Sequence, residues 1–323
     1  MQRLDLKLDP YVNDIGHLGV ALTNLAEILI PCLDAVRARS VAEVGAYAGD
    51  LTRLLLDWAE PSGAKVIAID PKPQRELEEL YEQRPELELI REPSLAALRR
   101  IELPDVVVID GDHNYYTVSE ELRLIAERAP HGVLPLFLLH DVCWPHGRRD
   151  DYFEPELIPE ERRQPIVPGG GLHPDEPGIE PEGMPYRWPA AREGGPANGV
   201  LTAVEDFVSR REDLRLAVVP AFFGLGAVWP ADAPWADAVA EALAPADGNP
   251  LLERLEDNRV RHLAVHRHMA IEATREAERA DRKDELLRRL AGSRTLALAG
   301  LLSRLRGRGK PTLTVDEVRR ALD

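Results

Sequence analysis

Short apolar runs alternate with amphipathic stretches through much of the chain. The runs are rich in Val, Ile and Leu and almost continuously apolar, which is typical of parallel strands buried on both faces. We expect strands at 41–44, 65–70, 87–90, 105–110, 133–140, 214–219 and 224–229. Helices are expected between them, at 50–59, 74–83, 94–100, 116–128 and 198–211. The pattern predicts an α/β fold, a doubly wound and mainly parallel seven-stranded sheet whose last strand turns back antiparallel to its neighbour.

A long segment without periodicity interrupts this alternation at 142–199. It contains many prolines and a run of three glycines at 169–171. Such a stretch inside a compact domain is usually a binding loop, a lid or a disordered insert. Because it directly follows the fifth expected strand, we expect a lid or substrate loop.

Helical patterns flank the α/β region on both sides. Apolar spacing over 15–38 predicts an N-terminal helix with a break near Pro31. Beyond residue 230 the chain reads as wholly helical, with a long charged helix at 249–291 and shorter ones at 294–306 and 315–322. We therefore divide the chain into 1–40, 41–230 and 231–323, the last being a helical extension. We interpret it as an oligomerisation or bracing arm, so a homo-oligomer is expected; a solvated single helix is the alternative.

The composition of the chain argues against several classes of partner and site. The chain carries 56 acidic and 40 basic residues, a formal charge of −16, which opposes binding to a nucleic acid backbone. Cys32 and Cys143 form no CxxC pair, so neither a disulfide framework nor a thiolate metal site is indicated, and a reducing cytoplasm is expected. No signal-peptide pattern and no apolar run of about 20 residues appears, so no membrane span is expected.

Two expected strands end in groups that can do chemistry. The fourth runs into Asp110, Gly111, Asp112 and His113, and the fifth ends in His140 and Asp141. In an open α/β sheet, ligands bind beyond the carboxyl ends of the strands, so these side chains should share one site. Carboxylates with imidazoles are typical of a metal-assisted or acid/base site.

The first expected strand leads into a glycine-bearing turn, Glu43-Val-Gly-Ala-Tyr-Ala-Gly-Asp50. Gly45 and Gly49 allow the backbone to approach a ligand at a helix start. The next strand ends 25 residues after Gly45 in Asp70, which suits the hydroxyls of a ribose. The spacing G-x-x-x-G is not the G-x-G-x-x-G that seats a pyrophosphate. Glu43 would instead lie near a cationic group.

These motifs resemble a known family. The pattern E-x-G-x-x-x-G followed by I-D is similar to the opening of class I S-adenosylmethionine-dependent methyltransferases. Residues 105–122, DVVVIDGDHNYYTVSEEL, resemble the I-D-G-x-H-x-Y segment of O-methyltransferases that tailor sugars and macrolides, the Methyltransferase-24-like family. Residues 135–151 and 199–207 also resemble it. The resemblance covers roughly 40–230 and implies a Rossmann-like methyltransferase domain.

The resemblance also implies roles for particular residues. S-adenosylmethionine would lie against the turn and the neighbouring strand ends, with its adenine at the turn containing Glu92 and Ser94. The implied cofactor residues are Glu43, Gly45, Tyr47, Gly49, Asp70, Glu92, Ser94 and Asp110.

On the acceptor side, the resemblance makes Asp110, His140 and Asp141 ligands of a divalent cation and His113 the general base. His140 stands where the family usually has Asp or Glu. Oxygen ligands favour magnesium, whereas an imidazole shifts the preference toward manganese, iron or zinc. Alternatively, His140 binds metal weakly or is the base of a metal-free enzyme.

Aromatic and charged residues just after the fifth strand suggest recognition of a polar acceptor, through Trp144, His146, Arg148 and Tyr152. For Arg148, an ion pair with nearby Asp150 or Asp151 is the alternative. We expect an S-adenosylmethionine-dependent O-methyltransferase of a hydroxylated small molecule, a sugar or natural-product scaffold, assisted by a divalent metal. The alternatives are a metal-dependent hydrolase, an NAD-dependent oxidoreductase and a non-catalytic assembly protein.

Overall fold

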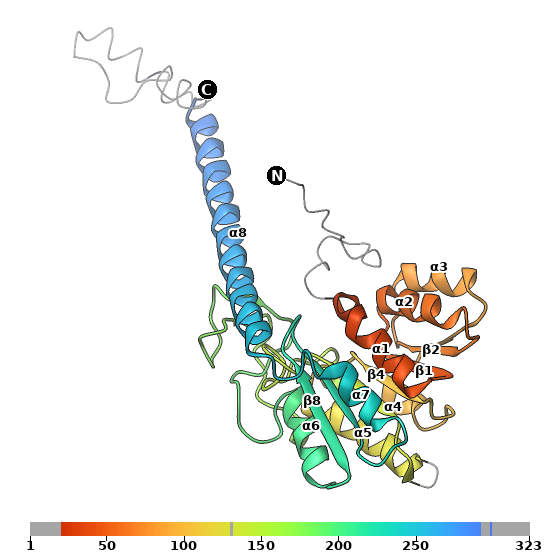
Figure 1. The fold of residues 1–323 in the computed structure, drawn as a ribbon. Helices are drawn as coiled ribbons and strands as arrows, with labels where there is room; N and C mark the ends of the chain where they lie inside the picture. The colour runs from red at the N-terminus through yellow and green to blue at the C-terminus, as the bar shows by residue number, and fades with distance from the viewer. Residues whose placement is uncertain (1–20, 130–131, 292–297, 299–323) are drawn as a thin grey trace, which may run out of the picture. The chain divides into compact units, whose positions relative to one another are not determined.

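The computed structural model describes residues 21–129, 132–291 and Leu298 (Figure 1). The expected helices at 294–306 and 315–322, and the first residues of the helix expected at 15–38, lie outside these ranges, apart from Leu298. The chain separates into one compact unit that ends at Ala264 and a second that begins at Val265. Residues 231–264, which the sequence pattern groups with the extension, therefore belong to the first unit.

A seven-stranded sheet with the order β3-β2-β1-β4-β5-β9-β8 forms the centre of the first unit. Its strands are β1 (Ser40–Val44), β2 (Lys65–Ile69), β3 (Leu87–Ile90), β4 (Val106–Ile109), β5 (Leu136–His140), β8 (Leu214–Val219) and β9 (Leu225–Pro230). β1 to β5 are parallel, and β9 is antiparallel to β5 and to β8. The predicted doubly wound sheet is confirmed. Its order reverses between β1 and β4, where such sheets bind ligands.

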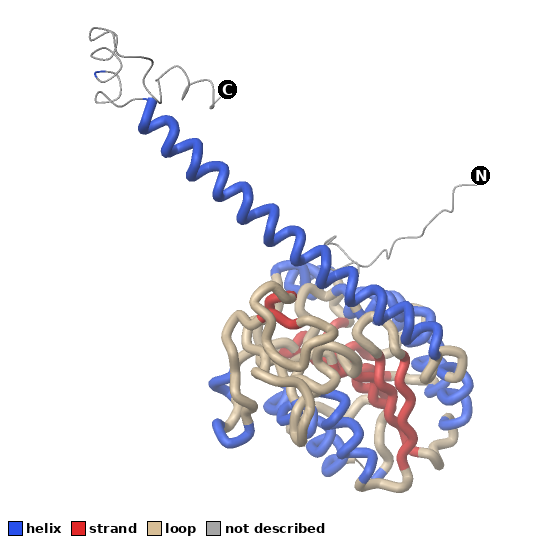
Figure 2. Tube along the Cα trace, turned by 90° about the vertical axis from the view of Figure 1, so that its left-hand side faces the viewer, coloured by secondary structure: helices blue, strands red, loops and turns tan. Residues whose placement is uncertain are grey.

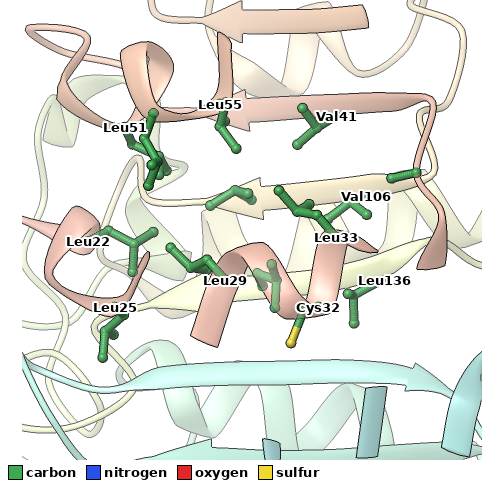
Figure 3. Packing of buried hydrophobic residues seen from close by; sticks show 14 of the residues in the cluster. Leu22, Leu25, Leu29, Cys32, Leu33, Val41, Leu51, Leu55, Val106 and Leu136 are labelled. Atoms are coloured by element: carbon green, nitrogen blue, oxygen red, sulfur yellow. The ribbon is translucent and has the colours of Figure 1, made fainter. Parts of the chain in front are cut away.

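Alternate strand residues face two separate helical layers. On one face, Val41 and Val106 pack with α1 (Ala26–Val36), α2 (Asp50–Ala59), α3 (Arg75–Gln83) and α7 (Ala236–Leu243). Figure 3 shows Leu29 and Leu33 of α1 in this core. On the other face, Ala42 and Val107 pack with α4 (Ser94–Ala97), α5 (Tyr115–Arg128) and α6 (Val200–Ser209). The sheet is thus buried on both faces, as its continuous apolar strands predict.

The predicted break near Pro31 is wrong. A 3₁₀ helix, η1 (Leu22–Leu25), leads into α1, which continues through Pro31 to Val36. A proline lacks the N–H that would bond to the carbonyl four residues back, here that of Glu27. Because Glu27 lies in the first turn of α1, the loss of one hydrogen bond there is tolerated.

The aperiodic segment 142–199 is part of the first unit and consists mostly of loops and turns, which Figure 2 draws in tan. It contains η3 (Pro155–Leu157), η4 (Glu160–Arg162), β6 (Gly171–Leu172) and β7 (Met184–Pro185). The buried carboxylate of Asp150 accepts hydrogen bonds from the amides of Tyr115 and Gly199, both at 2.7 Å. Arg149, only 1% exposed, donates to the carbonyls of Ala190 and Pro177. These buried contacts tie the segment to the start of α5 and to α6.

One continuous helix, α8 (Pro250–Ala291), spans the boundary between the two units. Its residues up to Ala264 belong to the first unit. None of the helices within the described residues is long and apolar enough to cross a membrane.

Candidate active site

The turn after β1 depends on glycine. Gly45 has a φ of +86°, and a Cβ there would lie 2.0 Å from the carbonyl oxygen of Asp110. Gly49 also has a positive φ, +81°, and directly precedes α2. A side chain at position 45 would separate the ends of β1 and β4, so the close approach requires glycine.

Glu43 lies two residues before Gly45, near the end of β1. It is 2% exposed, and Thr52 Oγ1 donates to its Oε2 at 2.6 Å. Burial raises the pKa of Glu43 to about 8, because the charged form loses its hydration. Glu43, Gly45 and Tyr47 line a cavity of about 460 Å³. A cationic ligand group in this cavity would stabilise the charged form of Glu43.

Asp70 connects two turns of backbone. Its carboxylate oxygens accept hydrogen bonds from the amides of Tyr47, at 2.8 Å, and Lys72, at 2.7 Å. Asp70 thereby holds the turn after β1 against the turn after β2, and it is not part of the described cavity lining. Each carboxylate oxygen can still accept a second hydrogen bond. Ribose binding by Asp70 stays a prediction.

The predicted adenine contacts also lie outside the described cavity lining. Glu92 forms an ion pair with Arg100 at 2.7 Å, and both side chains are largely exposed. Ser94 begins α4, and its hydroxyl lies beside the buried carboxyl of Glu121. The structure leaves the roles of Glu92 and Ser94 in cofactor binding as predictions.

The ends of β4 and β5 bring three potential metal ligands together. One ligand atom each from Asp110, His140 and Asp141 lies within 4.8 Å of the others. His140 is the last residue of β5, and Asp141 follows with a φ of 59°. All three line the same cavity as the glycine turn. The three potential ligands and the glycine turn thus face one cavity.

His140 is held through both ring nitrogens. Nε2 lies 2.8 Å from the carbonyl oxygen of Phe222, which only accepts, so Nε2 carries a hydrogen. Nδ1 lies 3.0 Å from Asp110 Oδ1 and 3.4 Å from Asp141 Oδ2. Burial opposes the charged imidazolium, but the two carboxylates outweigh it and raise the pKa of His140 well above its usual value. Nδ1 therefore faces a position that requires a proton or a cation.

His113 lies beside this cluster. Its Nδ1 is 3.1 Å from Asp141 Oδ2. Its ring stacks on that of His146, with centroids 4.7 Å apart and planes 13° apart. Burial lowers the pKa of His146 to about 3, so that ring is neutral. Burial also disfavours charge on His113, yet the surrounding carboxylates, Asp141 first, raise its pKa.

The acceptor side of the cavity differs from the predicted set. Of the four predicted acceptor residues, His146 lines the cavity, whereas Trp144, Arg148 and Tyr152 lie outside its described lining. Arg148 pairs with Glu205 at 2.6 Å rather than with its sequence neighbours. The hydroxyl of Tyr152 donates to Asp150 at 2.8 Å and accepts from the amide of Gln164. Acceptor binding by these three residues remains a prediction.

Several lining residues were missed by sequence reasoning: Ala21, Leu22, Thr23, Met184, Tyr186, Phe223 and Leu263. Met184 and Tyr186 come from the aperiodic segment, where no periodic signal marks a residue as inward-facing. Phe223 comes from the turn between β8 and β9, and long-range packing brings it to the cavity. A larger cavity, about 630 Å³, is lined by residues of α5, of α6 and of the segment 161–164, and its described lining contains none of the predicted site residues.

Comparisons with known proteins agree with this geometry. A family model described as "Methyltransferase domain" matches residues 42–142. A search of curated proteins found no match.

Solved structures of methyltransferases are similar to this chain at low sequence identity. The S-adenosylhomocysteine-bound methyltransferase PaMTH1 of Podospora anserina is 14% identical, with 68% of this chain and 83% of that chain covered and a TM-score of 0.43. A methyltransferase from Geobacter sulfurreducens is 12% identical, with 67% and 83% covered and a TM-score of 0.38. Both TM-scores lie below 0.5, so these structures do not indicate which ligand this chain binds.

The matched residues begin in β1 and end two residues beyond β5. They contain the glycine turn, both chemically active strand ends and the reversal point of the sheet order. This match favours a methyltransferase over the alternatives of a hydrolase, a nicotinamide oxidoreductase and a non-catalytic protein. Residues 42–142 match a methyltransferase domain, and this match favours an S-adenosylmethionine-dependent methyltransferase.

Proposed function

We propose that this methyltransferase transfers the methyl group of S-adenosylmethionine to a hydroxyl oxygen of a small molecule with the help of a divalent cation. The observation that carries the proposal is the cluster of Asp110, His140 and Asp141, whose ligand atoms converge within 4.8 Å. The cluster opens onto the same cavity as the glycine turn. Cofactor and cation would therefore be neighbours.

The donor set fits a cation. Nε2 of His140 donates to the carbonyl of Phe222, which directs Nδ1 toward the two carboxylates. Metal-bound histidines commonly use such a contact to fix the ring and its tautomer. The raised pKa of His140 shows that its surroundings favour a positive charge. Two carboxylates and one imidazole suit manganese, iron or zinc better than magnesium.

A bound cation would hold the acceptor oxygen and lower its pKa. His113 is the residue placed to receive the hydroxyl proton. Its Nδ1 donates to Asp141 at 3.1 Å, which leaves Nε2 as the free base. Asp141 therefore orients the base in addition to serving as a ligand.

On the donor side, Gly45 and Gly49 let the cofactor approach the backbone, while buried Glu43 stabilises its positive charge. Methyl transfer requires an in-line approach of the acceptor oxygen. Met184, Tyr186 and Phe223 form largely apolar parts of the cavity wall. They would restrict water and hold the acceptor, which we propose to be a sugar or natural-product scaffold.

Transfer of labelled methyl from S-adenosylmethionine tests this function directly. The candidate acceptors should include glycosides and hydroxylated aromatic scaffolds with neighbouring hydroxyls, together with matched compounds that carry a single hydroxyl. Each acceptor is assayed with metal-stripped protein and again after addition of Mn²⁺ or Mg²⁺. We expect labelled O-methyl products only with a cation. Full activity in EDTA would show that the reaction needs no cation. Label on nitrogen would show that the acceptor atom is not an oxygen. Asp175→Asn, at an exposed ion pair with Arg261, is a control that should remain active.

We also propose that the second unit pairs with another copy of the chain. Val265, Met269, Leu286 and Leu290 of α8 are exposed apolar side chains on it. Apolar residues exposed along one helix are typical of an interaction surface. Light scattering should show a dimer or higher oligomer that Met269→Glu or Leu286→Glu weakens; a monomer at all concentrations would contradict this proposal.

A further inference from the structure

The first turns of α8 are linked to the proposed cation centre. We infer that Glu256 is a positioning residue for that centre: it holds the turn between β8 and β9, whose carbonyl orients His140. This inference rests on the proposed cation. Glu256 lies far beyond residue 142, the end of the matched methyltransferase domain.

The turn between β8 and β9 has an unfavourable backbone. Phe222, Phe223 and Gly224 have consecutive positive φ angles of 51°, 67° and 91°. Residues with a Cβ rarely adopt this region, and bulky ones least of all. Two phenylalanines in succession stay there only when neighbouring groups hold them.

Glu256 supplies much of that restraint. Its side chain is buried, and its two carboxylate oxygens accept from adjacent amides, Oε2 from Phe222 at 3.0 Å and Oε1 from Phe223 at 2.8 Å. Arg259 donates to the same carboxylate from Nε, at 2.7 Å, and from a terminal nitrogen, at 2.5 Å. The Arg259 guanidinium also lies over both aromatic rings, 5.5 Å from the centroid of Phe222 and 4.4 Å from that of Phe223.

The other side of the same turn contacts the end of β5. The carbonyl of Phe222 accepts from Nε2 of His140 at 2.8 Å, and the carbonyl of Phe223 accepts from the amide of Cys143 at 2.7 Å. Packing is tight as well, since a Cβ at Gly224 would lie 2.5 Å from Sγ of Cys143. A movement of the turn would therefore shift the acceptor that fixes the His140 ring.

These contacts form a short series from α8 to Nδ1 of His140, the proposed metal-binding atom. Glu256 fixes the amide of Phe222, the carbonyl of Phe222 fixes Nε2 of His140, and Nδ1 of His140 then faces Asp110 and Asp141. The glycine turn after β1 takes no part in this series of contacts. Loss of Glu256 should therefore weaken cation binding while leaving cofactor binding intact.

The test measures Mn²⁺ and cofactor affinity separately in the full chain. Metal-stripped protein saturated with S-adenosylhomocysteine is titrated with Mn²⁺, and free Mn²⁺ is followed by electron paramagnetic resonance. Calorimetry gives the affinity for S-adenosylhomocysteine, and thermal unfolding reports stability. The variants are Glu256→Ala and Glu256→Gln, with Asp257→Asn as the matched control, because Asp257 is the next residue on α8 and pairs with exposed Arg261.

Removal of an outer contact to a metal ligand commonly costs 10- to 100-fold in affinity. We expect Glu256→Ala to weaken Mn²⁺ binding by about tenfold, the lower end of that range. Glu256→Gln should lose less, because its amide oxygen can still accept from one of the two backbone amides. Asp257→Asn should match the wild type, and all variants should bind S-adenosylhomocysteine alike.

Each outcome has a distinct meaning. If the wild type binds Mn²⁺ and both Glu256 variants bind it equally well, the inference is wrong. If Glu256→Ala lowers cofactor and Mn²⁺ affinity together, Glu256 is only a structural residue. If Glu256→Ala does not fold, Glu256→Gln alone decides. If the wild type binds no Mn²⁺, the proposed cation itself is wrong.

Discussion

The two halves of the cavity are assembled in different ways. The proposed cofactor half is lined by one short stretch, Glu43 to Leu51, and depends on backbone geometry at its glycines. The proposed acceptor half gathers residues from the segments that follow β4 and end β5, from the aperiodic segment and from the turn between β8 and β9. It depends on charged side chains that hold one another in place. Substitutions in the two halves should therefore affect different binding steps.

Asp141→Asn should have the largest effect. Asp141 contacts His113 at 3.1 Å and His140 at 3.4 Å, so an amide there weakens both the base and the cation site. We expect the rate of methyl transfer to fall by on the order of 10³-fold. Affinity for S-adenosylhomocysteine should stay within about twofold, since the glycine turn is untouched. A large loss of that affinity would show that the two halves of the cavity do not act independently.

Gly45→Ala should act on the other half. Its Cβ would lie 2.0 Å from the carbonyl of Asp110, so the ends of β1 and β4 must move apart. We expect at least about a 100-fold loss of S-adenosylhomocysteine affinity in calorimetry, with lower thermal stability. Gly63→Ala is the matched control. Gly63 also has a positive φ, +66°, but open space around it, so this change should cost only about 1 kcal/mol of stability.

Sequence reasoning was most successful where neighbours in sequence make the site. The parallel strands, the glycine turn and the acidic strand ends follow local patterns, and their placement around one cavity follows from the sheet order. Tyr186 and Phe223 could not be predicted, because long-range packing alone brings them to the cavity. The same packing engages Arg148 with Glu205, 57 residues away in sequence.

Glu121→Gln should change stability rather than either binding step. Burial raises the pKa of Glu121 from 4.5 to about 8, so the folded state favours the protonated form. That stabilisation is complete below the unfolded pKa and is lost as the pH rises through 8. The variant should therefore exceed the wild type in unfolding free energy by on the order of 3 kcal/mol at pH 8 and little at pH 4.5.

Chemical denaturation across this pH range is the measurement. Exposed Glu60→Gln is the control and should show no such growth with pH. A stability difference for Glu121→Gln that does not depend on pH would show that Glu121 is not protonated in the folded state.

Arg148→Ala should have the smallest effect. Arg148 pairs with Glu205 at a partly exposed position, and such ion pairs contribute at most about 1 kcal/mol to stability. We expect an unchanged KM for the acceptor in steady-state kinetics. A tenfold rise in that KM would show that Arg148 contributes to acceptor binding.

In the proposed site, Nδ1 of His140 faces a cation position, which is filled by a proton when no metal is bound. Nuclear magnetic resonance of protein with ¹⁵N-labelled histidine, titrated with Zn²⁺ in the presence of S-adenosylhomocysteine, tests it directly. We expect Nδ1 of His140 to be protonated without metal and to lose that proton on Zn²⁺ binding, while Nε2 keeps its hydrogen bond to Phe222. An Nδ1 that stays protonated at saturating Zn²⁺ would show that it does not face a cation position.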